Sequence, residues 1–146
     1  MSAPQTDSPL AERVLACMME AVIHADRQGL IALWNPAAET MFGFSAAEAI
    51  GQSLDIIIPE PQRAGHWAGF DVTMATGITK YGDGQLLKAP ALTKDRGRIS
   101  VEFTIVIIPG ENNLPSGIVA VARDASEGFE ERRAMRKRIA ELEAGR

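Results

Sequence analysis

The 146-residue chain has one cysteine, few aromatic residues and no long apolar run. Its lone thiol, Cys17, forms no intrachain disulfide, which excludes the cross-linked framework of small secreted proteins. No segment approaches the roughly 18 consecutive apolar residues of a membrane span. The start, MSAPQTDS, also lacks the charged and apolar regions of a signal peptide. We therefore expect a cytoplasmic protein without a membrane segment.

Positive charge is also scarce. Lys and Arg total 15 against 19 Asp and Glu, which gives a formal net charge of −4. Sequence-independent binding to nucleic acid requires a cationic surface that displaces counterions from the phosphates. We therefore expect a protein or small-molecule partner and no nucleic acid.

Motifs of catalysis are missing as well. The chain contains no G-x-x-x-x-G-K-[ST], G-x-S-x-G or H-E-x-x-H pattern. It has only two histidines, His24 and His66, which are far apart in the sequence. The sequence predicts that the protein is not an enzyme.

The chain does have 46% apolar content, which is sufficient for one hydrophobic core and hence one main domain. Its first nine residues, rich in Ser, Pro and Thr, predict an unstructured tail. Apolar residues at helical spacing, beginning with Leu10 and Val14, then predict an amphipathic helix. The tail and this helix together make up residues 1–20. The central domain is expected over 21–125. A charged helix of the signalling or coiled-coil kind, with a partial heptad seam, is expected over 126–146.

Strands and short helices follow one another in the central domain. Capping residues predict two short helices: one that begins at Asn35-Pro36 and ends at Gly43, and one that begins with a capping box of Ser45 and Glu48. A longer helix is expected over 62–75. Apolar runs predict strands at 21–26, 30–34, 79–87, 91–94, 99–108 and 117–123.

Several separated motifs resemble those of the PAS family and occur in the order of that fold. They are W-N-P-A-A-E at 34–39, F-G-F-S at 42–45, E-A-I-G at 48–51, K-D-R-G at 94–97 and V-A-R-D-A-S at 121–126. The resemblance covers about residues 15–126, with one residue inserted in the K-D-G hairpin motif. It implies an α+β fold, a five-stranded antiparallel sheet flanked by short helices, here with N-terminal and C-terminal extension helices.

A sharper resemblance lies at residues 59–70, PEPQRAGHWAGF. This stretch is similar to that of haem-binding PAS sensors of the FixL and direct oxygen sensor type, in which the matching histidine is the proximal haem ligand. The resemblance implies haem b as the cofactor, His66 as its iron ligand, and a diatomic gas such as CO, NO or O₂, or a redox change, as the signal. It also offers Arg63 as a partner for a haem propionate, although Arg63 could equally pair with Glu60.

The chemistry of His66 is compatible with this role. A neutral imidazole is a normal axial ligand of haem iron, and helical spacing places Phe70 and Met74 near His66. A histidine that faces a sheet is also commonly a hydrogen-bonded, half-buried residue, and the apolar residues named here equally suit a filled core. The candidate lining residues on the strands are Leu86, Leu87, Phe103 and Ile105.

One feature departs from the haem-binding oxygen sensors. The strand about twenty residues after the proximal histidine lacks the distal Arg or Met of those proteins and has Leu86 and Leu87, one of which faces inward. Such an apolar wall admits CO or NO and offers bound O₂ little stabilisation. A flavin is not expected, because the flavin photoreceptors of the family need a cysteine after the second helix, whereas Cys17 precedes the first strand.

Two functions stay open at this point. The first is a sensory module that binds haem, or another small ligand, in its core and biases its terminal helices. The alternative is a cofactor-free PAS module for dimerisation or protein interaction, or one that binds another apolar ligand. We expect a homodimer formed through the sheet and the N-terminal helix. No output domain follows residue 146, so we expect either version to act in trans on a downstream signalling protein unless the chain is a fragment.

Overall fold

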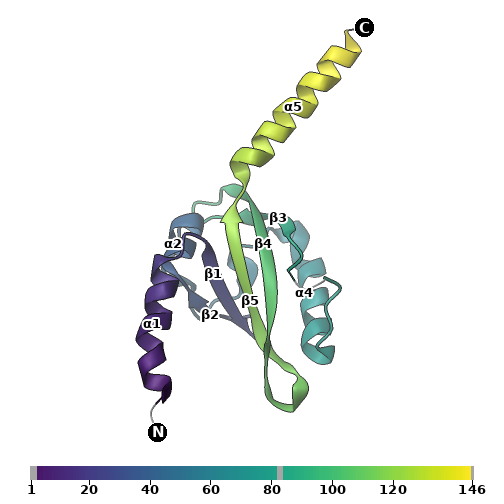
Figure 1. Cartoon of the computed structure of the whole chain (residues 1–146). Helices are drawn as coiled ribbons and strands as arrows, with labels where there is room; N and C mark the ends of the chain where they lie inside the picture. Colours follow the sequence, from purple (N-terminus) through teal and green to yellow (C-terminus); the bar gives the residue numbers. More distant parts are fainter. Residues whose placement is uncertain (1–2, 82–83, 146) are drawn as a thin grey trace.

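The computed structural model describes residues 3–81 and 84–145. Its centre is a five-stranded antiparallel sheet with the strand order β2-β1-β5-β4-β3 (Figure 1), which confirms the predicted sheet. The strands are β1 Ala21–Asp26, β2 Ile31–Trp34, β3 Leu87–Leu92, β4 Arg98–Pro109 and β5 Pro115–Asp124. The helices are α1 Ala3–Cys17, α2 Pro36–Phe42, α3 Ala46–Ala49, α4 Glu60–Thr76 and α5 Ser126–Ala144, with the short 3₁₀ helices η1 Leu54–Ile56 and η2 Glu111–Asn113.

The short helices α2 and α3 begin where the capping residues predict. The Asn35 side chain accepts from the N–H of Ala38 at the start of α2, and Gly43 ends that helix with φ 84°. Ser45 and Glu48 form the reciprocal hydrogen bonds of a capping box on α3. Local sequence alone therefore determines both helix starts.

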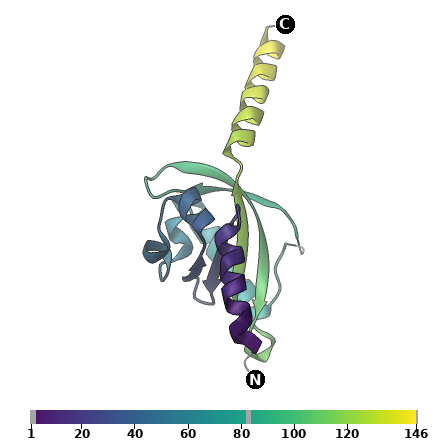
Figure 2. The same cartoon turned by 60° about the vertical axis from the view of Figure 1, so that its left-hand side comes forward.

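One face of the sheet carries the hydrophobic core. Side chains alternate along each strand, so residues paired across strands share a face, and Ile23, Ala120 and Ile105 lie in one such row. Helical residues from the segment between β2 and β3 pack against this inner face, and Figure 2 shows these helices on one side of the sheet. They are Ala38, Phe42, Ala49, Leu54, Phe70 and Met74.

The start of α1 differs from the prediction. Helix α1 extends from Ala3 to Cys17 and includes Pro9, so the prediction of an unstructured tail is wrong for residues 3–9, while residues 1–2 lie outside the described part. Inside a helix, proline removes one hydrogen bond and its ring crowds the carbonyl four residues earlier, so Pro9 weakens α1, although its fixed φ near −65° lies in the helical range.

The third strand also differs from the prediction. A strand over 79–87 is wrong, because residues 78–81 and 84–86 have no strand structure and β3 begins only at Leu87. Gly84 has φ 72°, which is incompatible with an extended strand. The predicted strand at 91–94 coincides with β3 only at residues 91–92, because β3 ends at Leu92 and includes Pro90; β3 lies at the edge of the sheet, where a proline without a donor is tolerated.

Asn35 connects α1, β1 and α2. Its side chain is 4% exposed and makes four hydrogen bonds. The carbonyl oxygen accepts from Val22 of β1 and from Ala38 of α2, and the amide nitrogen donates to the carbonyls of Leu15 and Glu20. This residue therefore holds the end of α1 against the sheet.

Helix α1 runs along one side of the domain, whereas α5 projects away from it (Figures 1 and 2). Helix α5 follows β5 almost without a linker. The N–H of Ala125 donates to the carbonyl of Ser100 at 2.7 Å, and the hydroxyl of Ser126 accepts from the N–H of Ser100 at 2.9 Å. In the described part of the chain, no helix is long and apolar enough to cross a membrane.

Candidate functional site

The candidate site is built on α4. Gly77, with φ 74°, ends this 17-residue helix by donating its N–H to the carbonyl of Thr73 at 2.7 Å. Phe70, Thr73 and Met74 are its buried residues, and His66 lies one turn before Phe70. The helix therefore carries its only histidine on the side that approaches the sheet.

His66 lies in an aromatic environment. Its ring centroid is 4.5 Å from that of Trp67 in an edge-on arrangement and 6.0 Å from that of Phe70 in a nearly parallel one. The Nδ1 atom is buried and has no hydrogen-bond partner among the described residues. A buried polar atom without a partner is costly, so this nitrogen is suited to a partner from outside the chain.

Burial lowers the pKa of the His66 imidazole, because a charged ring would lose its hydration. The carboxylate of Asp55 acts in the opposite direction and has the smaller effect. The ring is therefore neutral near pH 7 and keeps a lone pair, which is the state that binds a metal.

The strand residues predicted to line the pocket separate into two groups. Phe103 and Ile105 lie on the inner face of β4 and are half-buried, packed against the edge of the core. Leu87 is opposite Phe103 in the β3–β4 ladder and shares its face. Leu86 precedes β3 and is 49% exposed, so Leu87 is the leucine that joins the inner face.

Arg63 turns toward the backbone of the preceding loop. Its Nε donates to the carbonyl of Ile58 at 2.9 Å and its Nη2 to the carbonyl of Asp55 at 3.3 Å. The Asp55 carboxylate lies 3.9 Å from Nε. In the structure, Arg63 thus fixes the loop before α4, and its contact with a ligand carboxylate stays a prediction.

Trp67 and Asp55, which sequence analysis did not place at the site, fix the part of α4 that carries His66. The Nε1 of Trp67 donates to the Asp55 carboxylate at 2.8 Å, which joins α4 to η1. The Trp67 ring packs at the β1–β2 turn, where a Cβ on Gly29 would lie 2.3 Å from it. The sequence shows a tryptophan directly after the candidate histidine, but its contacts with Asp55 and Gly29 could not be predicted, because these residues come from distant segments.

At the candidate site, the described residues provide His66 as a metal ligand and no cluster of further ligands around it. In 3–81 and 84–145, no three His, Cys, Asp or Glu side chains gather in a group that could hold a metal ion. Cys17, the free thiol, is exposed at the end of α1 and away from α4. A metal at His66 would need to bring its other ligands with it.

A five-stranded antiparallel sheet with short helices over one face is the fold that the sequence motifs predicted. The chain belongs to the PAS family: its residues 11–125 match the family described as PAS fold. This match confirms the resemblance and the α+β fold class. PAS domains are typically sensory modules, and this chain is one of them.

Similar proteins agree with the family. The sensor protein FixL of Bradyrhizobium diazoefficiens is 45% identical over 53 residues, which cover 36% of this chain and 10% of that protein. The match therefore spans about one tenth of the length of this curated relative.

Solved structures show the same fold at low sequence identity. A PAS domain from Colwellia psychrerythraea has a TM-score of 0.70 at 22% identity, over 82% of this chain and 98% of that one. An RNA-binding light-oxygen-voltage receptor has a TM-score of 0.72 at 17% identity, over 91% of this chain and 37% of that one. These likenesses concern the fold.

Proposed function

We propose that this PAS domain is a sensory module that binds haem b, with His66 as the proximal iron ligand. The observation that carries the proposal is the buried Nδ1 of His66, which has no partner among the described residues. The partial match to FixL supports the same cofactor by analogy. As part of this proposal the domain is cytoplasmic and not catalytic.

The chain's own residues fit such a group. The lowered pKa of His66 keeps its ring neutral and able to coordinate iron at neutral pH. Phe70 is buried one turn after His66 on α4, and Met74 is buried one turn further along; Phe103 and Ile105 provide an apolar, half-buried wall on β4. Bound haem would supply an iron centre that binds a diatomic gas or changes oxidation state.

The apolar wall determines which signals fit best. Leu87 lies on the inner face of β3 opposite Phe103, and a leucine offers no hydrogen bond to a gas molecule. CO and NO need no such donor, whereas bound O₂ is stabilised by one. We therefore propose CO, NO or a redox change ahead of O₂.

Absorption spectroscopy tests the cofactor. The protein is purified from haem-supplemented cells and also titrated with hemin, and we expect a Soret band that His66→Ala abolishes or shifts. His24→Ala is the matched control, because the His24 ring bonds the carbonyl of Ile118 and lies on β1. Circular dichroism verifies the fold of both variants. The absence of a band after titration would refute the proposal.

A second candidate function is a cofactor-free interaction module that dimerises through α1. The observation that favours it is the exposure of Leu10 and Val14, at 54% and 51%, four residues apart on one side of α1. Helix α5 adds exposed apolar residues at heptad spacing, Met135, Ile139 and Leu142. We propose these surfaces for a second copy and for a downstream signalling protein.

A further inference from the structure

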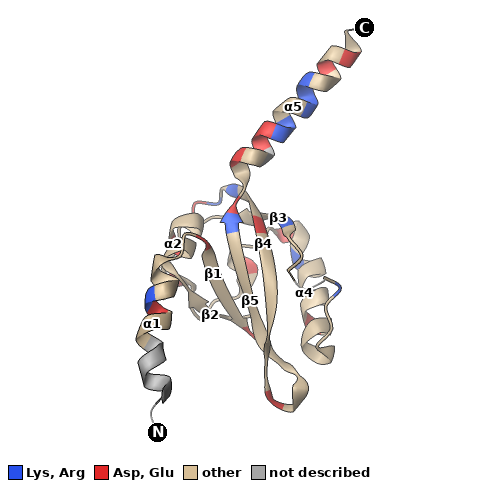
Figure 3. Cartoon of the chain, in the orientation of Figure 1, with Lys and Arg blue, Asp and Glu red and all other residues tan. Residues whose placement is uncertain are grey.

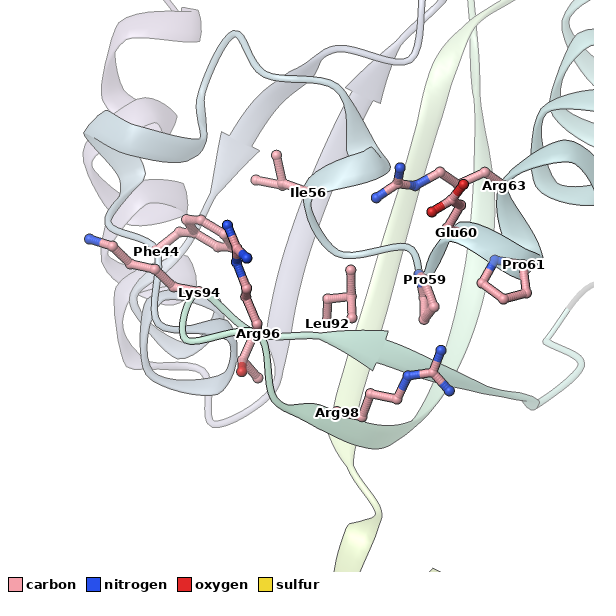
Figure 4. A pocket seen from close by; sticks show the side chains of 11 residues that line it. Phe44, Ile56, Pro59, Glu60, Pro61, Arg63, Leu92, Lys94, Arg96 and Arg98 are labelled. Carbon is pink, nitrogen blue, oxygen red and sulfur yellow. The ribbon is translucent and has the colours of Figure 1, made fainter.

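A second concave site lies on the outside of the domain. A cleft of about 690 Å³ opens between the segment before α4, the start of α4 and the β3–β4 hairpin (Figure 4). Its volume is typical of small-molecule sites. Of the residues proposed to bind the cofactor with His66, only Arg63 also lines this cleft.

The cleft concentrates positive charge in an acidic chain. Four cationic side chains line it, against the single carboxylate of Glu60, in a chain whose net charge is −4. The four are Arg63, Lys94, Arg96 and Arg98.

Two of these cations already have partners and two do not. Arg63 donates to backbone carbonyls, and Lys94 forms an ion pair with Glu48 at 2.5 Å. The guanidinium groups of Arg96 and Arg98 make no hydrogen bond or ion pair with any residue that the structure describes. They are therefore the groups available to an anion, and a guanidinium binds phosphate or carboxylate through two parallel hydrogen bonds.

Apolar side chains form the rest of the cleft. Figure 4 shows Leu92 between Arg96 and Arg98, with Ile56 and Pro59 on the opposite wall. Phe44 adds a half-buried aromatic ring. This lining fits a ligand that has an apolar or aromatic body as well as charge.

The backbone conformation of Arg96 allows a variant that removes its guanidinium without adding backbone strain. Arg96 occupies the left-handed region with φ 66°, in a turn closed by hydrogen bonds between Thr93 and both Arg96 and Gly97. Glycine adopts this conformation more readily than arginine. An Arg96→Gly variant therefore loses the guanidinium while its backbone becomes less strained.

We propose that this cleft binds a small organic dianion with an apolar or aromatic body, held by Arg96 and Arg98. The charged part is an organic phosphate or a dicarboxylate, since a guanidinium binds a pair of oxygens of either group through two parallel hydrogen bonds. The site is separate from His66 and does not depend on haem.

Calorimetric titration at low ionic strength tests the site with three probes. Phenyl phosphate and phthalate represent the phosphate and the dicarboxylate, and inorganic phosphate carries the charge without the apolar body. We expect one of the two aromatic dianions to bind at least several-fold more tightly than inorganic phosphate. Amide chemical shifts should change at Phe44, Leu92 and Arg98 and not along α5.

Three variants assign the binding to the proposed cations. Arg96→Gly and Arg98→Gln should each weaken the bound probe about tenfold or more, because each removes a charge-assisted contact. Arg133→Gln, on the exposed part of α5, is the matched control and should bind like the wild type. Thermal unfolding should show that Arg96→Gly is at least as stable as the wild type.

Three results would overturn the proposal. They are the absence of binding of both aromatic dianions at probe concentrations up to about 10 mM, equal affinity for inorganic phosphate, and unchanged affinity in both cleft variants.

Discussion

At the residue scale, the His66 ring couples protonation to folding. Burial lowers its pKa in the folded chain, while the unfolded chain keeps the ordinary value of about 6.5. Between these two values the unfolded state binds more protons, so the free energy of unfolding increases with pH. The penalty from this ring is absent above about pH 6.5 and grows as pH falls toward the folded value.

We therefore predict that the cofactor-free protein loses stability between about pH 7 and pH 5 in a way that depends on His66. The melting temperature of the wild type should fall more over this range than that of His66→Gln. An NMR titration of the ring should place its midpoint below about 6.5. A midpoint at or above that value would contradict the burial of this ring.

Gly29 leaves free the space that the Trp67 ring occupies. Its φ of 78° favours glycine, and a Cβ there would lie 2.3 Å from the Trp67 ring. Gly29→Ala should cost about 3 kcal/mol or more, because backbone strain of about 1–2 kcal/mol adds to displacement of the ring. Chemical denaturation measures this loss, and tryptophan fluorescence reports the ring.

Gly51→Ala is the matched control for that prediction. Gly51 also has a left-handed φ, 91°, but nothing lies within 4 Å of its missing Cβ. This variant should show the backbone penalty of about 1–2 kcal/mol alone and leave the fluorescence unchanged. Equal losses in the two variants would mean that Trp67 does not need the space above Gly29.

The sequence predicted part of this site and could not predict the rest. The motif around His66 singled out this histidine as a candidate, and helical spacing placed Phe70 one turn after it, where the two rings contact each other; the role of His66 as an iron ligand stays a prediction. The bond between Trp67 and Asp55 and the contacts of Arg63 depend on how η1 meets α4. Such contacts follow from tertiary packing, and no local pattern in the sequence encodes them.

At the element scale, Asn35 does more than cap α2. Asn35→Ala should lower the free energy of unfolding by about 2–4 kcal/mol, because it removes a helix cap and leaves buried groups of three segments without partners. Ser45→Ala, which removes the exposed cap of α3, should cost only about 1 kcal/mol. Urea unfolding measures both values.

Limited proteolysis gives that prediction a second readout. Asn35 donates to the carbonyls of Leu15 and Glu20, so its loss should expose the segment between α1 and β1 to cleavage, whereas loss of Ser45 should not. Equal cleavage of the two variants would show that other contacts hold α1 in place.

The elements also show where local signals are sufficient. Helices α2 and α3 were predicted because their caps bond within a few residues. Strand β3 was not, because its pairing with β4 and its position at the edge decide whether Pro90 is tolerated. For α1, the Pro-rich composition suggested disorder although proline's φ is compatible with a helix.

At the scale of the whole molecule, the terminal helices are the surfaces that we propose for assembly. If α1 pairs with a second copy, Leu10→Asp and Val14→Asp should convert a dimer into a monomer, measured by light scattering after size-exclusion chromatography. Ala11→Asp changes an exposed neighbour by the same charge and should have a smaller effect. A dimer that persists in the first two variants would place its interface elsewhere.

Helix α5 carries charges of both signs. Figure 3 shows Asp and Glu toward both ends of α5 and Lys and Arg in its middle, and the apolar residues Met135, Ile139 and Leu142 are also exposed on it. Such a surface suits pairing with another helix, with charges that select the partner.

The direct joint between β5 and α5 has a mechanical consequence. Ser100 on β4 bonds both Ala125 and Ser126, so the base of α5 follows the strands of the sheet. The helix has 19 residues, which at 1.5 Å each make a rod of about 28 Å. A tilt of about 5° at the joint moves the far end by about 2.5 Å. A small displacement of the sheet would therefore be enlarged at the far end of α5.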